Sequence, residues 1–264
     1  MVSEYLSLTF YPLSMEFREL SNVEWNIIKT LLPPKPKRGR KASSDDRSLI
    51  NGILYVITTG CRWREMPRKY GSYVTAWRRL RRLQELGIWE KIMNLLSSTR
   101  SCENVAVDST TIEAKRGGEC VGYDGFKHRK GTKVHVMVDE DSKPLAVVIS
   151  PGNTHDSRMF DEVYGRLRDR PLRLYGDSAY DTDEIRLKLE RDGVQANIPV
   201  NPRNGRRPIP YDERGYRVMK SAVERFNSWL KTFRRAVVRY ERLAVMFQAI
   251  ITFTCIMIHM RYGL

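Results

Sequence analysis

The hydrophobic pattern changes from helical to extended near residue 100, and this change constrains the fold more than any other feature of the chain. Upstream, apolar residues recur every three or four positions. Downstream, three apolar, partly alternating runs follow one another with polar turns between them, at residues 105–114, 132–140 and 143–150. The sequence therefore predicts a helical module over residues 1–98 and an α/β unit over residues 99–264.

Helices and strands alternate beyond the three predicted strands. A helix is predicted over residues 153–170, with Asp156 as its cap and five residues facing inward, namely Met159, Phe160, Val163, Tyr164 and Leu167. A strand over 171–177, a helix over 181–193 and a strand over 194–200 follow, and then helices over 218–237 and 244–260. Three strands, a helix, a strand, a helix and a strand is the order of an RNase H-like α/β domain.

The first 98 residues are expected to be all helical, with helices over 16–32, 46–59 and 72–89. Ser21 or Asn22 is the expected cap of the first, whose inward-facing apolar row begins at Val23. In the third helix, Val74, Trp77, Leu80 and Leu83 recur every three residues and predict a buried stripe. Four arginines fall largely off this stripe: Arg78, Arg79, Arg81 and Arg82. A helix, a glycine-containing connector and a basic amphipathic helix are typical of a helix-turn-helix that reads the major groove of DNA, although a plain core helix has the same pattern.

Charge favours a polyanionic partner. The chain has 46 Lys and Arg against 31 Asp and Glu, a formal net charge of +15. Neutralising phosphates releases condensed counterions, so such an excess promotes binding to nucleic acid, although basic proteins without such a partner exist. Five of the seven residues 35–41 are basic, which predicts a phosphate-gripping arm or a solvated linker.

The remaining composition predicts a cytoplasmic, nucleoid-associated protein without a membrane span. The four cysteines form no CxxC pair, and their spacing from His128 and His135 matches no common zinc finger. The first seventeen residues lack the basic and apolar regions of a signal peptide. The apolar run 244–260 is short and contains Gln248 and Thr252, so we expect a buried helix rather than a membrane span.

Three acidic residues stand in settings that local helix or strand chemistry does not require. Asp108 closes the apolar run VAVD on the opposite face from Val105 and Val107. Asp177 ends the strand of LYGD, where α/β sheets usually place ligands. Glu224 lies on a polar helical row with Lys220, Asn227 and Lys231, which an ordinary solvated face would also produce. Three carboxylates are the hard oxygen ligands that Mg²⁺ needs in phosphoryl transfer.

Five motifs in order are similar to those of DDE transposases of prokaryotic insertion sequences, in the family-five branch of the family-four and family-five group. They are VAVDSTTIEAKRGG, GFKHRKGTKVHVMVD, GNTHDSRMF, LYGDSAYD and AVERFNSWLK, and the resemblance covers roughly residues 15–262. It implies that Asp108, Asp177 and Glu224 are the catalytic, metal-binding acids. The family's Glu-x6-Lys pattern falls on Glu224 and Lys231. In one departure, the Tyr-x2-Arg-x3-Glu signature has Lys220 in the arginine place and Tyr216 one residue early.

The resemblance also implies the substrate and the cofactor. Such an enzyme binds the terminal inverted repeats of its element as a homodimer, cuts with water and joins the freed 3′-hydroxyl to target DNA, with two Mg²⁺ or Mn²⁺ ions. A basic cluster is expected to line the DNA, unless it is only a charged hairpin: Lys127, His128, Lys130, Lys133 and His135. Two alternatives stay open, a non-catalytic DNA-binding descendant of such an element and a hydrolytic nuclease of the same fold.

Overall fold

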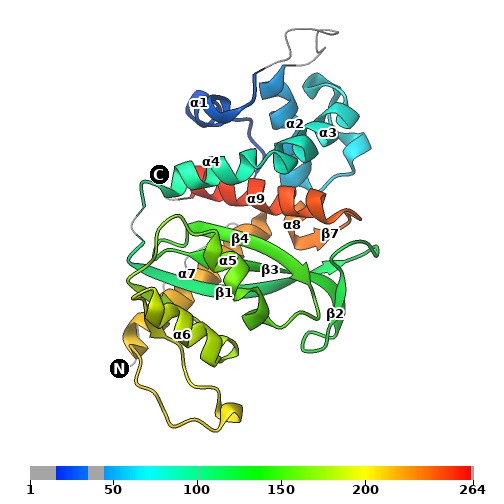
Figure 1. The fold of residues 1–264 in the computed structure, drawn as a ribbon. Helices are drawn as coiled ribbons and strands as arrows, with labels where there is room; N and C mark the ends of the chain where they lie inside the picture. Colours follow the sequence, from blue (N-terminus) through cyan, green and yellow to red (C-terminus); the bar gives the residue numbers. More distant parts are fainter. Residues whose placement is uncertain (1–15, 35–44, 101, 263–264) are drawn as a thin grey trace, which may run out of the picture.

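The computed structural model describes residues 16–34, 45–100 and 102–262. The N-terminal stretch tested for a signal peptide and most of the predicted basic arm lie outside these ranges, in residues 1–15 and 35–44. The described chain forms a helical layer that packs on a mixed sheet (Figure 1).

The helical module contains α1 (Asn22–Leu31), α2 (Asp46–Thr59), α3 (Tyr73–Glu85) and α4 (Ile88–Ser97), with the short 3₁₀ turns η1 (Trp63–Glu65) and η2 (Arg68–Tyr70) before α3. The predicted bounds of α2 are confirmed, because Asp45 caps its first turn and Gly60 ends it at a left-handed φ of 73°. Ser21 caps α1, as the sequence predicted, and forms a capping box with Glu24, so the helix begins at Asn22.

The prediction of one helix over 72–89 was wrong in two respects. The segment is two helices, because Gly87 adopts a left-handed φ of 66° and separates α3 from α4. The predicted stripe also fails at its start, since Val74 is 36% exposed whereas Ala76, Leu80 and Leu83 are buried. At about 100° per residue, a row of residues three apart drifts by about 180° over three steps, so Val74 cannot share a face with Leu83. Val23 of α1, also expected inside, is exposed.

The sheet has the strand order of an RNase H-like domain. The strands are β1 (Asn104–Ala114), β2 (Gly122–Asp124), β3 (Arg129–Val138), β4 (Pro144–Pro151), β5 (Arg173–Tyr175), β6 (Gln195–Asn197) and β7 (Val238–Arg239). β1 pairs antiparallel with β3, which pairs antiparallel with β4, while β5 and β6 continue in parallel from the other edge of β1. The order is therefore β4-β3-β1-β5-β6, with β2 beside β3 and β7 parallel to the end of β1.

Side-chain alternation divides the core between the two faces of the sheet. Val105 and Val107 face α5 (Phe160–Gly165) and α6 (Asp183–Arg191), where the short turns η3 (Asp156–Met159) and η4 (Ser178–Tyr180) also lie. Ala106 and Ile112 face the other core, which contains α7 (Glu213–Thr232), α8 (Arg234–Val237) and α9 (Ala244–Arg261). The predicted helix 153–170 is shortened to η3 and α5, and a further turn η5 (Pro202–Asn204) precedes α7.

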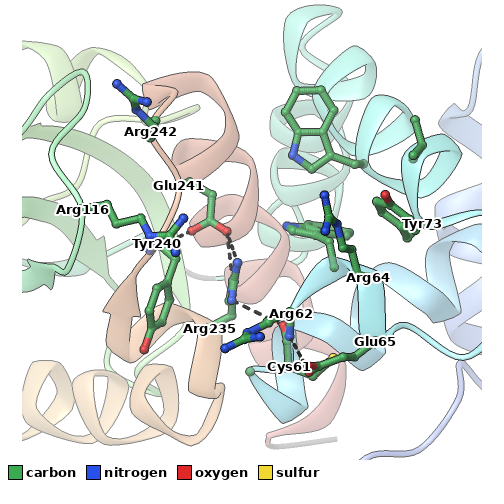
Figure 2. Close-up of a pocket in the computed structure, with 14 residues that line it drawn as sticks. Cys61, Arg62, Arg64, Glu65, Tyr73, Arg116, Arg235, Tyr240, Glu241 and Arg242 are labelled. Atoms are coloured by element: carbon green, nitrogen blue, oxygen red, sulfur yellow. Dashed lines mark hydrogen bonds and ion pairs between the residues drawn. The ribbon is translucent and has the colours of Figure 1, made fainter.

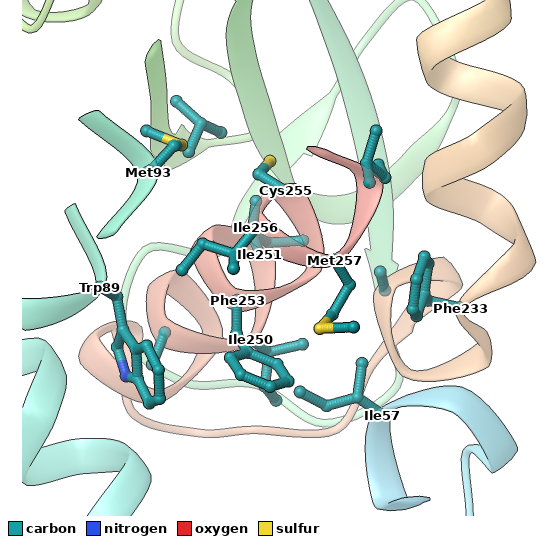
Figure 3. Close-up of a cluster of buried hydrophobic side chains, with 14 of the residues drawn as sticks. Ile57, Trp89, Met93, Phe233, Ile250, Ile251, Phe253, Cys255, Ile256 and Met257 are labelled. Carbon is teal, nitrogen blue, oxygen red and sulfur yellow. The ribbon is translucent and has the colours of Figure 1, made fainter. Parts of the chain in front are cut away.

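Helix α9 is the centre of the larger core. It lies between the sheet and α4 and contacts α3, α4, α7, α8 and β4 (Figure 1). Phe253 packs edge-on against Trp89 of α4, with ring centroids 5.0 Å apart, among the buried side chains drawn in Figure 3. Helix α9 is long enough, and with a mean hydropathy of 1.5 apolar enough, to cross a membrane. However, 83% of this helix is buried inside the protein, as expected for a core helix. The helical module and the sheet therefore share one core.

We expect Phe253→Ala to destabilise the whole described fold by about 3 to 5 kcal/mol, because the cavity would open where the two parts meet. Urea unfolding followed by near- and far-UV circular dichroism should show one transition that shifts as a unit. Leu95→Ala, on α4 but 46% exposed, is the matched control and should change stability by less than about 0.5 kcal/mol. Separate transitions for helices and sheet would contradict the shared core.

Candidate active site

Parallel pairing between β1 and β5 brings two of the predicted acids side by side. Val105 pairs with Leu174 and Ala106 with Tyr175. Asp108 and Asp177 each lie two residues beyond the Ala106–Tyr175 pair, so they occupy the same level at the carboxyl end of β5. Asp108 lies on the same face as Ala106, which is the face covered by α7. The sequence prediction that Val105 and Val107 point the other way is confirmed.

Asp177 is held by the turn that follows β5. Its carboxylate accepts a hydrogen bond of 2.9 Å from the backbone N–H of Ala179 and thereby caps η4. Gly176 makes this approach possible, because a Cβ at that position would meet Val107 Cγ1 at 3.0 Å and the Tyr180 ring at 3.3 Å. The missing side chain lets the turn lie close against β1.

Helix α7 supplies Glu224. Its buried side, formed by Val223, Phe226 and Leu230, packs in the larger core and leaves Glu224 exposed at the edge of the sheet. A cavity of about 140 Å³ collects the site, and its polar lining residues are Asp108, Asp177, Tyr216, Lys220 and Glu224. The structure thus brings the three predicted acids to one cavity together with Lys220. Tyr216, whose place in the family signature is shifted, lies there as well.

Burial and crowding of negative charge disfavour ionisation in this cavity. Desolvation, with the nearby carboxylates of Asp177 and Asp156, raises the pKa of Asp108 from 3.8 to about 6. Desolvation also raises the pKa of Asp177, against the opposing effect of its hydrogen bond from Ala179 and the positive charge of Lys220. A cation in the cavity would relieve both costs.

The donor set of the cavity fits a hard divalent cation. Three carboxylates offer only oxygen ligands, which Mg²⁺ and Mn²⁺ prefer over softer sites. The amide of Asn227 donates to Asp108 over 3.5 Å, and its buried carbonyl oxygen has no partner within the described chain. Within the described ranges, no three His, Cys, Asp or Glu side chains are already gathered closely enough to coordinate a metal. The acids line one cavity without forming a preassembled metal cage.

Asp156 is a fourth acid that the sequence prediction treated only as a helix cap. His155 caps η3 instead, through its Nδ1, which accepts from the N–H of Ser157. Asp156 accepts hydrogen bonds from Ser109 (2.8 Å) and Lys133 (2.9 Å) and adds its charge to that around Asp108 and Asp177. The GNTHD motif, which follows β4 directly and ends at Asp156, was the one sequence feature that could have indicated this role.

The predicted DNA-contacting residues differ in how far their side chains are exposed to solvent. Lys220, Lys231, Lys127, His128 and Lys130 are exposed. Lys127 is close enough to act electrostatically on both Asp108 and Lys231, which locates the β2–β3 turn beside the cavity. Lys133, in contrast, has only 14% of its side chain exposed and donates to Asp156 and the Thr154 carbonyl. The prediction that His135 lines the DNA was wrong, because its side chain is fully buried against Ser150.

Two of the four arginines of α3 pair with carboxylates, and the other two are exposed. Arg79 pairs with Asp46 of α2 at 3.1 Å, and Arg81 pairs with Glu85 at 2.7 Å. Arg78 and Arg82 are exposed, and neither pairs with a carboxylate among the residues that the structure describes. These two are the arginines of α3 that a DNA backbone or base edge could reach.

The fold and the carboxylate-lined cavity define the class as an RNase H-like phosphoryl-transfer enzyme. A family model described as "Transposase DDE domain" matches residues 103–258, and one described as "Putative transposase of IS4/5 family" matches residues 20–93. The chain therefore belongs to the DDE transposase family. The family, the enzyme class and the fold expected from the five motifs are confirmed.

The chain is also similar to named proteins of bacterial insertion sequences. The "Putative transposase for insertion sequence element IS6501" of Brucella ovis is 30% identical over 131 residues, covering 49% of this chain and 98% of the relative. The "Insertion element IS402 uncharacterized 16.2 kDa protein" of Burkholderia cepacia is 39% identical over 110 residues, covering 37% of this chain and 75% of the relative. Among solved structures, a piggyBac transposase synaptic complex matches with a TM-score of 0.46 and 13% identity, over 89% of this chain and 70% of that one.

We predict that, in chelator, the stability of the wild type falls relative to Asp108→Asn as pH rises from about 4 to 7. A raised pKa means that the folded state holds the proton more tightly, so ionising Asp108 costs stability, by at most about 3 kcal/mol. Urea unfolding from pH 4 to 8 measures this. Adding Mg²⁺ at pH 8 should stabilise the wild type more than Asp108→Asn.

The control for this titration is Asp169→Asn, whose carboxylate is 65% exposed and far less desolvated. Its stability should follow that of the wild type across the whole pH range. Parallel curves for the wild type and Asp108→Asn would show that Asp108 ionises in the folded chain as easily as in the unfolded one.

Proposed function

We propose that this protein binds the terminal inverted repeats of its own insertion sequence, cuts the DNA at their ends and joins the freed 3′-hydroxyl to target DNA. The observation that carries the proposal is the single cavity to which β1, the end of β5 and α7 bring Asp108, Asp177 and Glu224. Family membership over residues 103–258 supports the same chemistry.

Asp108, Asp177 and Glu224 would hold divalent metal, with two Mg²⁺ or Mn²⁺ ions as the expected complement. Bound metal supplies charge stabilisation at the attacking and leaving oxygens of an in-line phosphoryl transfer. Asn227 orients the Asp108 carboxylate through its amide. Lys220, which lines the same cavity, would neutralise a phosphate oxygen of the DNA. Lys127 and Lys231, which lie near each other, would contact neighbouring phosphates of the DNA strand.

We infer a division of labour along the chain. Residues 1–98 recognise the element's ends through α3, and residues 99–264 carry out the reaction. The shared core around α9 supports a fixed orientation between the two parts. Two ends must be brought together for transposition, so the active species is a homodimer on DNA that acts at the nucleoid. A hydrolytic nuclease would need the same cavity, and only the joining step separates the two functions.

Each of Asp108→Asn, Asp177→Asn and Glu224→Gln should lower cleavage and joining by at least about a thousandfold, because each removes a charged ligand worth about 4 kcal/mol to the transition state. Binding to end DNA should change less than about threefold. Purified full-length protein, labelled end DNA and a target plasmid would be incubated with Mg²⁺, Mn²⁺, Ca²⁺ or chelator. Cleavage and joining would be scored separately.

Glu213→Gln is the matched control on the same helix, since Glu213 is exposed and lies outside the cavity. It should keep full activity with Mg²⁺ or Mn²⁺, and Ca²⁺ should permit binding with poor catalysis because its coordination geometry is looser. Near wild-type joining by one acid variant would remove that residue from the site. Cleavage by the wild type without any joining would favour the nuclease.

The double variant Arg78→Gln/Arg82→Gln should weaken binding of full-length protein to end DNA at least tenfold. It should make the slope of log affinity against log salt shallower by about 1.8, because two phosphate-neutralising charges are lost. Fluorescence anisotropy across a salt series measures both quantities. Arg81→Gln, whose guanidinium pairs with Glu85, is the control and should bind nearly as the wild type. End binding by the double variant that matches the wild type would show that α3 is not the reading element.

A further inference from the structure

A second and much larger cavity, of about 1060 Å³, lies between the helical module and the catalytic sheet. One wall comes from η1 and α3 and the other from the segment between β7 and α9, together with Arg116 beyond the end of β1 (Figure 2). It shares no lining residue with the carboxylate cavity. Asp108 lies six residues before the end of β1 at Ala114, which corresponds to about 20 Å. The two cavities are therefore distinct sites.

This cavity is strongly cationic. Its lining contains five arginines, against Glu65 and Glu241 as its two acids: Arg62, Arg64, Arg116, Arg235 and Arg242. Arg235 and Glu241 are both buried and pair with each other at 2.8 Å. The other four arginines are exposed, and no described carboxylate pairs with their guanidinium groups. Unpaired cations along a concave surface attract a polyanion.

Aromatic rings accompany these cations. Trp63, Tyr73 and Trp77 line the helical wall, and Tyr240, which is 44% exposed, lies on the opposite wall. The indole N–H of Trp63 is buried and has no acceptor among the described residues. Phosphates of an intact duplex need only the arginines, because duplex bases already stack on one another. Rings interleaved with cations are typical of sites that stack unpaired bases and neutralise their phosphates.

The sheet-side wall is fixed in place. Gly118 lies so close to Arg242 that a Cβ would meet its carbonyl oxygen at 2.4 Å, and Glu119 N–H donates to that oxygen over 2.8 Å. The fully buried Arg239 donates to the carbonyls of Glu119 (2.6 Å) and Cys120 (3.1 Å). These bonds fasten the segment after β1 to the start of α9. A ligand therefore finds the wall already formed, at a reduced entropic cost.

We propose that this arginine–aromatic cleft binds unpaired nucleotides of a DNA strand, with phosphates on Arg62, Arg64, Arg116 and Arg242. The bases would stack on the exposed Tyr240 ring and on the partly buried rings of the opposite wall. The assignment rests on the proposed function, because cleavage at the carboxylate cavity would provide the strand. About six nucleotides span 20 Å at the duplex spacing of about 3.4 Å each, and fewer do so in an extended unpaired strand. A strand freed at Asp108 can thus reach the cleft without leaving the protein.

The test measures binding of fluorescein-labelled (dT)12 to full-length protein by anisotropy, in chelator so that no cleavage takes place. Arg64→Gln/Arg242→Gln should weaken (dT)12 binding at least tenfold and make the salt slope shallower by about 1.4. Tyr240→Ala should weaken binding at least fivefold without changing the salt slope. All these side chains are exposed, so melting curves should match the wild type. Arg191→Gln, exposed at the end of α6, removes a remote charge and should change binding less than twofold.

A competition experiment tests, without any cleavage, whether the cleft prefers unpaired DNA to a duplex. A tenfold preference for (dT)12 over a 12-base-pair duplex in competition, lost in the cleft variants, supports the assignment. Equal (dT)12 affinity in wild type and cleft variants overturns it, and so does a duplex that competes as well as the single strand. The acid variants must retain (dT)12 binding whether or not they cleave, so failure of the cleft and failure of the proposed catalytic acids give different results.

Discussion

The burial of α9 is the interaction on which the rest of the structure depends. An 18-residue helix with almost no polar side could not remain in water, and it is covered by the sheet below and by α3 and α4 above. The same burial fixes the position of the basic face of α3 relative to Asp108. A helical module that could otherwise swing on a linker is held by apolar contacts such as Phe253 on Trp89. In the proposed function, recognition and chemistry would therefore share a common rigid support.

The carboxylate cavity lowers the stability of the folded protein, whereas the burial of α9 raises it. Parallel pairing between β1 and β5 sets Asp108 and Asp177 at one level, and η3 adds Asp156 nearby. Burial first, and then the like charges of Asp177 and Asp156, disfavour the ionised form of Asp108 and raise its pKa. Such a cost is expected where a protein is arranged for a cation rather than for its own metal-free state.

Features set by neighbouring residues could be predicted, and features set by distant contacts could not. Asp45 and Gly60 fix the ends of α2 locally, and alternation along β1 correctly assigned Asp108 to the face opposite Val105. The short strands β2 and β7 exist only because β3 and β1 pair with them, so their own sequence gives no signal. The role of Asp156 depends on Lys133 and Ser109, which are distant in sequence. The arginine–aromatic cleft combines residues from 60 to 242 and is invisible to any local pattern.

The position of α9 in the chain has a consequence for how the protein is made. Every element that α9 covers is synthesised before it, and about 150 residues separate the end of α4 at Ser97 from Ala244. At typical translation rates the apolar side of the helical module emerges about 7 to 30 s before its partner exists. During that interval Trp89 lacks its partner Phe253, and the nascent chain exposes apolar surface that α9 later covers. The helical module can therefore complete its core only after α9 has been synthesised.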